Sequence, residues 1–173
     1  MKPAKRKKLL VVGGGGIGGI TSAYLKNASY DVTIYDTDEK HVEMINKKGL
    51  FIDGVRGDKR VNVNAITKLE DDYDIVFLSV KSLHTKEALE TISSHLKPSS
   101  MVVSLQNGIN EEVISKTIGG KRTIGCIVGW GATNLGPGRL THTSEGQFII
   151  GRLDGTIDSK IEEIKDILDN VTE

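Results

Sequence analysis

The sequence has a single cysteine, no net charge and no long apolar run. With Cys126 alone among 173 residues, an internal disulfide and a cysteine-based zinc cluster are excluded. The 23 basic and 23 acidic residues cancel, so no overall field favours nucleic acid or a membrane, although a basic cluster lies at residues 2–8. No segment approaches the ~18 apolar residues of a membrane span, and the basic residues lead into a strand, not into a signal peptide. We therefore expect a cytoplasmic protein that binds neither nucleic acid nor membrane.

Metal-binding patterns are missing as well. The four histidines, His41, His84, His95 and His142, do not have the spacing of zinc ligands, and we expect no metal site. The first three fall on predicted helices, where we expect solvated or partly buried side chains. Cys126 lies in an apolar segment and is expected to be a small buried hydrophobe. A nucleophilic cysteine would need a partnered base, and none can be named here. We give Cys126 no catalytic role and assign none to any other residue of this chain.

Glycine, by contrast, is concentrated directly after the first apolar run. Residues 9–12 predict a strand, and the run that follows contains G-x-G-x-x-G as Gly13, Gly15 and Gly18 before a helical pattern. That is the context of a dinucleotide-binding turn. Gly13 permits the turn, Gly15 lets a pyrophosphate approach the backbone, and Gly18 lets the helix pack closely, while the helix N-terminus attracts the phosphates. A second reading of the motif (14, 16, 19) also fits, but in the first the motif follows the strand at once. The residues of this turn expected to form the cofactor-binding site are Gly13, Gly14, Gly15, Gly16, Ile17 and Gly18.

An acidic residue follows the second predicted strand. Residues 32–35 form an apolar run, and Asp36 lies 18 positions beyond Gly18. This is close to the roughly 20-residue spacing at which an acid binds the adenosine ribose hydroxyls. The sequence therefore predicts Asp36 as a cofactor-binding residue.

Along the chain, apolar periodicity alternates between strands and helices. Further strands are predicted at 75–80, 101–105 and 123–128, and helices at 17–27, from the N-cap Asp38 to near Gly49, and at 85–96, 111–118 and 157–171. This series predicts a doubly wound, mainly parallel α/β sheet of Rossmann type spanning residues 1–173. The runs 50–52 and 61–63 predict an inserted hairpin, and short strands at 139–143 and 148–150 follow the turn at 136–138.

Three groups follow predicted strands: the glycine turn, Val80-Lys81-Ser82 and Gln106-Asn107-Gly108. In a parallel sheet they meet at the carboxyl edge, where such folds bind ligands. Together with Gly129-Trp130-Gly131-Ala132 and the segment 142–146, they resemble the ketopantoate reductase (2-dehydropantoate 2-reductase) family, in its N-terminal cofactor domain. The resemblance covers nearly the whole chain.

The resemblance implies an NAD(P)H-dependent reductase that transfers a hydride to the ketone of a small α-keto acid, in the synthesis of pantothenate and coenzyme A. It implies that Lys81 and Asn107 line the nicotinamide end of the cofactor. Asn107 would also bind the substrate, and Ala132 would contact the cofactor through its backbone. The residue types agree, because a lysine can bind ribose hydroxyls or a carboxylate and an amide can donate and accept at once.

Two features depart from the family. Many members carry an arginine near the end of the second strand, which suits the 2′-phosphate of NADP, whereas this chain has Tyr35-Asp36-Thr37-Asp38. Two acids would repel that phosphate, so we favour NADH over NADPH, although Lys40 could serve NADPH. The family also has a helical C-terminal domain with the general-acid lysine. This sequence stops in or just after the helix leading toward it (157–173), so the isolated chain is expected to be inactive.

Two other functions stay open on the sequence. One is a reductase of a different keto acid, and the other is a non-catalytic dinucleotide-binding sensor. We expect an exposed apolar face where a C-terminal domain would pack, formed by the last helix unless its apolar stripe packs on its own sheet. Such a face favours self-association, for example as a homodimer.

Overall fold

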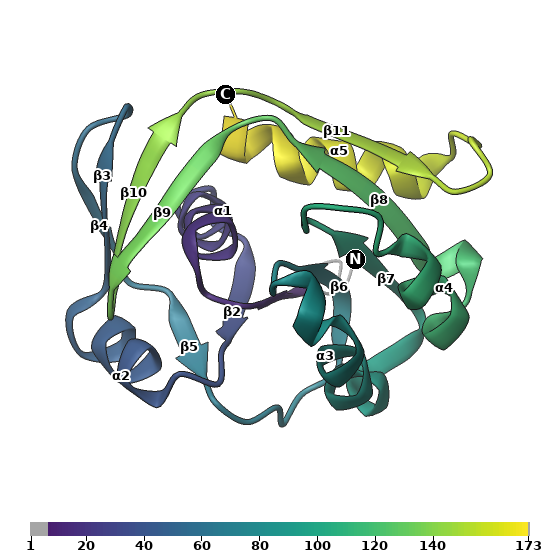
Figure 1. Ribbon diagram of the computed structural model, residues 1–173, viewed down its shortest axis with the longest axis horizontal. Coiled ribbons are helices and arrows are strands. Elements are labelled where there is room, and N and C mark those ends of the chain that lie inside the picture. The colour runs from purple at the N-terminus through teal and green to yellow at the C-terminus, as the bar shows by residue number, and fades with distance from the viewer. Residues whose placement is uncertain (1–6, 173) are drawn as a thin grey trace, which may run out of the picture.

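The chain folds around a seven-stranded sheet, shown in the computed structural model of Figure 1. The structure describes residues 7–172, so Glu173 and most of the basic cluster at residues 2–8 lie outside it. The strand order is β11-β8-β7-β6-β1-β2-β5. β11 is antiparallel to β8, and all other neighbours are parallel. The strands are β1 (Lys8–Val12), β2 (Asp31–Tyr35), β5 (Asn64–Ile66), β6 (Tyr73–Leu78), β7 (Leu96–Ser104), β8 (Thr123–Val128) and β11 (Phe148–Arg152).

Helices cover both faces of this sheet, which confirms the doubly wound fold. α1 (Gly16–Asn27), α2 (Glu39–Lys48) and α5 (Ser159–Thr172) pack on one face, and α3 (Thr85–Ile92) and α4 (Glu111–Ile118) on the other. Alternate residues of β1 enter different cores: Leu9 joins the first and Leu10 the second. Both are almost fully buried, and burying such a side chain contributes about 1.5–3 kcal/mol. Strands covered on both faces are apolar at nearly every position, which is why they could be predicted.

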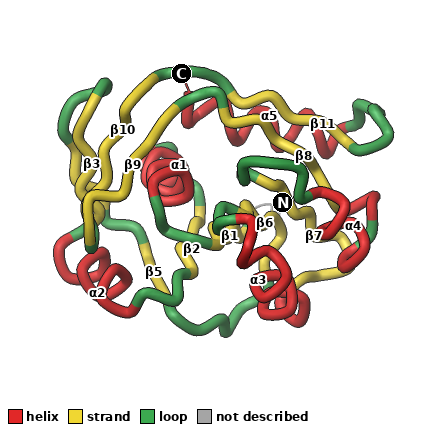
Figure 2. The backbone as a smooth tube through the Cα atoms, in the orientation of Figure 1, coloured by secondary structure: helices red, strands yellow, loops and turns green. Residues whose placement is uncertain are grey.

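A second, four-stranded sheet covers the other side of α1. It contains β3 (Leu50–Gly54), β4 (Lys59–Val61), β9 (Gly131–Gly136) and β10 (Arg139–Ser144), in the order β4-β3-β10-β9. The predicted inserted hairpin is β3–β4, and it joins the β9–β10 hairpin through parallel pairing of β3 with β10. Figures 1 and 2 show β9 and β10 passing beside α1. All residues from 18 to 25 of α1 are buried, as expected of a helix between two sheets.

Arg56, in the β3–β4 turn, connects the second sheet to the last helix. Its guanidinium donates to the carbonyl oxygens of Val171 and Thr172, both at 2.8 Å, and lies 5.3 Å from the ring centroid of Tyr24 on α1. The last carbonyls of a helix lack helical partners, and the helix dipole favours a cation there. Arg56 therefore satisfies the end of α5 while it holds the β3–β4 hairpin against α1.

The helix predicted at 85–96 is too long. α3 ends at Ile92 and continues as a 3₁₀ turn over Ser93–His95. β7 then begins at Leu96 instead of Met101 and includes Pro98. The pairing of β7 with β6 is irregular near Tyr73, and a proline is tolerated where ladder pairing is interrupted.

The last helix begins at Ser159, two residues later than predicted. The carboxylate of Asp158 accepts hydrogen bonds from the N–H groups of Lys160 and Ile161, at 3.0 and 3.1 Å, which is the geometry of an N-cap. The apolar stripe of α5 is buried against its own sheet. Strand β5 was not predicted, because three residues are too few to show a period. No helix within residues 7–172 is long and apolar enough to cross a bilayer.

Candidate functional site

The glycine turn joins β1 to α1 at the carboxyl edge of the large sheet. Gly13 has a φ of +96°, which glycine adopts without strain, and its N–H donates to the Tyr35 carbonyl at 2.8 Å. Gly15 is the N-cap of α1. The first helical hydrogen bond runs from the Gly19 N–H to the Gly15 oxygen (2.7 Å). The amides of residues 16–18 therefore lack helical partners and are available to an anion.

The surroundings of Gly15 and Gly18 agree with the roles in the first reading of the motif. A Cβ on Gly18 would overlap the Gly13 carbonyl oxygen and the Ser79 hydroxyl, so only glycine lets α1 pack this closely on β1 and β6. A Cβ on Gly15 would meet nothing within 4 Å. The space beside Gly15 is open to an approaching group, as the sequence interpretation requires.

Asp36 lies beside the turn at the end of β2. Its Oδ2 accepts a hydrogen bond from the Gly14 N–H at 2.6 Å, and its Oδ1 accepts one from the Asp38 N–H at 2.9 Å. The side chain is half-buried. These two bonds hold the carboxylate next to the turn, and a half-exposed carboxylate can still accept hydrogen bonds from ligand hydroxyls.

The loops after β6 and β7 are connected to each other. Ser82 Oγ donates to the Asn107 carbonyl at 2.9 Å, and Asn110 Nδ2 donates to the same carbonyl at 3.0 Å. Gln106 Nε2 donates to the Val80 carbonyl at 2.8 Å. The side chains of Lys81 and Asn107 are exposed on these loops. A Cβ on Gly13 would lie 3.1 Å from Val80, so the glycine turn adjoins the Lys81 loop at the point where the strand order reverses, the usual ligand crevice of such folds.

Ala132 reaches the same edge from the second sheet, although it is far from the turn in sequence. A Cβ on Gly16 would lie 2.9 Å from the carbonyl carbon and oxygen of Ala132. Thus Ala132 stands beside the start of α1. The residues predicted to bind a cofactor therefore lie along one edge, contributed by the glycine turn, Asp36, the Lys81 and Asn107 loops, and β9.

The expectation that His41 is solvated or partly buried is wrong. His41 is 2% exposed, its Nε2 lies 2.8 Å from the Gly14 oxygen, and its Nδ1 accepts from the Gly138 N–H at 3.0 Å. Sequence reasoning missed it because only tertiary structure brings α2 against both glycines. His84 is exposed and His95 half-buried, as expected.

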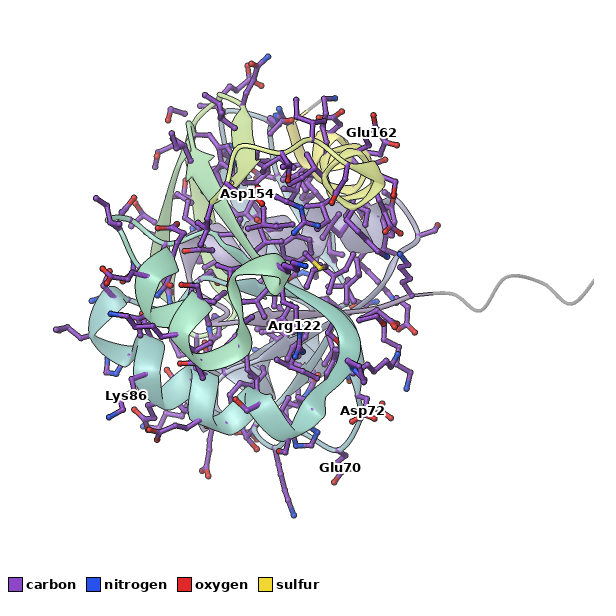
Figure 3. All side chains as sticks on the ribbon, turned by 90° about the vertical axis from the view of Figure 1, so that its right-hand side faces the viewer. Glu70, Asp72, Lys86, Arg122, Asp154 and Glu162 are labelled. Atoms are coloured by element: carbon purple, nitrogen blue, oxygen red, sulfur yellow. The ribbon has the colours of Figure 1, made fainter. Side chains whose placement is uncertain are left out.

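An exposed apolar face exists, but α5 does not form it. Ile127 on β8 and Ile149 on β11 pair side by side and are 65% and 64% exposed, and Ile109 is 90% exposed. They line a depression of about 730 Å³ that also includes Asn107. Figure 3 views the molecule from the α4 and α5 side, with Glu162 of α5 at the top and Lys86 of α3 below.

Cys126 is a buried hydrophobe, as expected. Burial, with a smaller contribution from the negative charge of Glu111, raises the pKa of its thiol to about 12. A thiol with such a pKa is almost entirely protonated near neutrality and is a poor nucleophile.

Comparisons with known proteins point to a reductase family. The family model for "Ketopantoate reductase PanE/ApbA" matches residues 9–155. The chain is 37% identical to the 2-dehydropantoate 2-reductase of Pyrococcus abyssi over 164 residues, which are 94% of this chain and 53% of that protein. The chain therefore spans about half the length of the curated relatives it matches.

Solved structures show the same fold. The crystal structure of 2-dehydropantoate 2-reductase from Geobacter metallireducens has a TM-score of 0.88 at 24% identity, covering 95% of this chain and 55% of that chain. A D-mandelate dehydrogenase solved with NADH and anilino(oxo)acetate has a TM-score of 0.83 at 24% identity, covering 95% and 53%.

Proposed function

The chain belongs to the ketopantoate reductase family, and from that premise we propose that it is the cofactor-binding half of an NAD(P)H-dependent 2-dehydropantoate 2-reductase. The observation that carries the proposal is the arrangement of the glycine turn, Asp36 and the loops of Lys81 and Asn107 along one edge of the sheet. Open backbone amides, an acid and a polar pair at that edge match the three parts of a nicotinamide dinucleotide: pyrophosphate, adenosine ribose and nicotinamide riboside.

The turn and Asp36 bind the adenosine half in this proposal. The amides of residues 16–18 donate to the pyrophosphate, which approaches the backbone at Gly15. The Asp36 carboxylate accepts hydrogen bonds from the ribose hydroxyls. A 2′-phosphate at the same place would face the negative charges of Asp36 and Asp38, which is the reason to favour NADH over NADPH. Lys40 is the one nearby cation in the sequence that supports the NADPH alternative.

Lys81 and Asn107 act at the other end of the cofactor. The bound dihydronicotinamide supplies the hydride that adds to the ketone carbon. The Lys81 ammonium binds ribose hydroxyls or attracts the substrate carboxylate, and the Asn107 amide orients the substrate while it contacts the cofactor. The Ala132 backbone closes the crevice beside Gly16.

A proton must reach the developing alkoxide for the reduction to be complete. We assign the proton donor to the half of the relatives that this chain does not span. General acid catalysis typically contributes ~10²–10⁴-fold. The 173-residue chain should therefore bind cofactor but not measurably reduce 2-dehydropantoate.

Fluorescence titration of the chain with NADH, and separately with NADPH, tests the proposal. We expect saturable binding, tighter for NADH. Asp36→Ala should weaken NADH binding roughly tenfold or more, because hydrogen bonds to a charged group are lost. It should also reduce the difference in affinity between NADH and NADPH. Asp72→Ala is the matched control, since Asp72 is exposed in the β5–β6 loop (Figure 3). Absence of binding to either cofactor would refute the proposal.

A second candidate is the reduction of a different α-keto acid. The D-mandelate dehydrogenase of the same fold was solved with NADH and anilino(oxo)acetate. Joining the chain to the remaining half of a relative and comparing keto acids as substrates would distinguish the two.

We also propose that the protein is a homodimer in the cytoplasm. The exposed Ile109, Ile127 and Ile149 support the dimer. Light scattering that shows only monomer at high concentration would contradict the dimer.

A further inference from the structure

Buried His41 bridges the glycine turn and the second sheet. It is the third residue after the N-cap Asp38, whose carboxylate accepts the His41 N–H at 3.1 Å. In the core, the ring lies between the carbonyl of Gly14 and the N–H of Gly138, at 2.8 and 3.0 Å. Because a backbone N–H can only donate, Nδ1 must be the unprotonated acceptor. Nε2 therefore carries the proton and donates to the Gly14 carbonyl.

Both polar groups of the Gly14 backbone are thus bound by side chains. The N–H donates to Asp36 at 2.6 Å, and the carbonyl accepts from His41. The described residues contain no cis peptide bond, and in a trans peptide the carbonyl and the next N–H point in opposite directions. When His41 holds the Gly14 carbonyl, the Gly15 N–H must point away from His41.

Nothing would lie within 4 Å of a Cβ at Gly15, whereas a Cβ at Gly14 would lie 2.9 Å from Ile34. Gly14 is therefore enclosed and Gly15 borders open space. The orientation of the peptide between them decides whether an N–H or a carbonyl oxygen points toward an anion near the start of α1. A carbonyl facing a pyrophosphate would repel it, so a fixed orientation matters for binding.

We propose that His41 is a positioning residue for the pyrophosphate of the dinucleotide. It fixes the Gly14–Gly15 peptide with the Gly15 N–H toward the phosphate, and through Gly138 it ties that orientation to the β9–β10 turn. This inference rests on the proposed function, because it requires a dinucleotide at the turn. His41 itself does not touch the cofactor.

Two conservative substitutions separate the two hydrogen bonds. The amide of His41→Gln reaches the position of Nε2 and can donate to the Gly14 carbonyl. The amide of His41→Asn reaches only the position of Nδ1, so it keeps an acceptor for Gly138 and loses the bond to Gly14. Ser100→Ala is the matched structural control. Ser100 is fully buried and lies at the opposite end of the sheet. Its hydroxyl donates to the Tyr73 carbonyl and accepts from the Lys97 N–H.

The experiment is an NADH fluorescence titration of each variant beside a thermal melt. We expect His41→Gln to bind within about threefold of the wild type, and His41→Asn to bind roughly five- to tenfold more weakly, the effect of one hydrogen bond. Ser100→Ala should melt lower but bind normally. Equal affinities for the Asn and Gln variants would overturn the inference. A wild type that binds no NADH would refute the proposed function instead, which keeps the two failures distinct.

If His41→Asn does not fold, the wild-type protein carries the test. In ¹⁵N spectra, NADH should shift the Gly15 amide more than the Gly13 amide, and His41 should keep its proton on Nε2. A Gly15 amide that does not move on saturation with NADH would overturn the inference.

Discussion

The two sheets that enclose α1 are built on different principles. In the large sheet, β1 and β6 are buried at nearly every position, whereas in the second sheet the exposure alternates, with Leu140 and His142 of β10 buried between exposed or half-exposed neighbours. Parallel strands covered on both faces have no solvent side, and a sheet covered on one face does. The large sheet is therefore buried on both faces, whereas the second sheet packs on α1 with one face and meets solvent with the other.

The two interfaces of α1 also differ in how their polar groups are satisfied. Toward the large sheet, the Ser79 hydroxyl donates to the Gly13 carbonyl at 2.8 Å. Around the second sheet, the buried Thr21 Oγ1 and Trp130 Nε1 lack hydrogen-bond partners within the described residues. Unsatisfied buried groups cost free energy, so the second interface is expected to be the less stable of the two.

The largest effect is expected from Gly18→Ala, which breaks the first interface. The added methyl overlaps the Gly13 oxygen and the Ser79 hydroxyl, and separating α1 from β1 should lower the free energy of unfolding by about 3 kcal/mol or more. Urea denaturation measures this loss. Gly15→Ala, where the methyl enters open space, should cost about 1 kcal/mol at most, because alanine is a poorer N-cap than glycine. Similar losses for the two variants would contradict the close approach.

A smaller loss is expected from Gly54→Ala in the second sheet. Gly54 has a φ of +112°, and a Cβ there would overlap the His142 carbonyl oxygen. We expect a loss of about 2 kcal/mol, because the exposed end of β3 can shift to relieve part of the overlap. Gly57→Ala separates the two causes, since Gly57 has a φ of +74° but nothing within 4 Å, and should cost about 1 kcal/mol from strain alone. Thermal melts of the two variants measure the difference. Equal melting temperatures would show that the contact with His142 is unimportant.

The pH dependence of stability should report on His142. Burial, assisted by the positive charge of Arg56, lowers the pKa of this histidine from its usual value of 6.5. The unfolded chain then binds more protons than the folded chain as the pH falls below about 6.5, so stability decreases toward pH 5. The titration of His142 changes the free energy of unfolding by at most about 1.4 kcal/mol per pH unit.

His142→Phe removes the titrating group and keeps an aromatic ring between Trp130 and Tyr24. The variant should show a flatter loss of stability between pH 7 and pH 5, in chemical denaturation at each pH. His84→Phe is the control, because His84 is exposed, and its profile should match the wild type. An unchanged slope in His142→Phe would show that the second interface does not disfavour the charged histidine.

For Cys126 in the large sheet, we expect an effect on thiol reactivity and not on stability. Its raised pKa of about 12 leaves roughly a thousandfold less thiolate at pH 8 than an ordinary cysteine with a pKa near 9. Alkylation by iodoacetamide should therefore be very slow in the folded protein and fast in urea, with mass spectrometry as the readout. Rapid labelling under native conditions would indicate that the β8–β11 edge opens easily.

Prediction from the sequence succeeded where a signal is local. The continuous apolar runs of β1, β6 and β7 predicted the large sheet, and the spacing of Gly13, Gly15 and Gly18 before a helix predicted the turn. Boundaries failed for two different reasons. The start of α5 was placed too early because Asp158, inside the predicted helix, acts as its N-cap. β7 extends through Pro98 because its pairing with β6 is irregular near Tyr73.

The sequence by itself determined the large sheet, the glycine turn and the position of Asp36. The strand periodicity, the spacing of the glycines and the number of residues between the turn and Asp36 are all set within one βαβ unit. Only the tertiary structure decided the second sheet, since β3 and β10 pair across almost ninety intervening positions, and no local pattern records such a pairing. The same long-range pairing brings Gly138 to His41 and Ala132 to Gly16. A histidine that looks like a surface residue in the sequence thereby becomes part of the support of the turn.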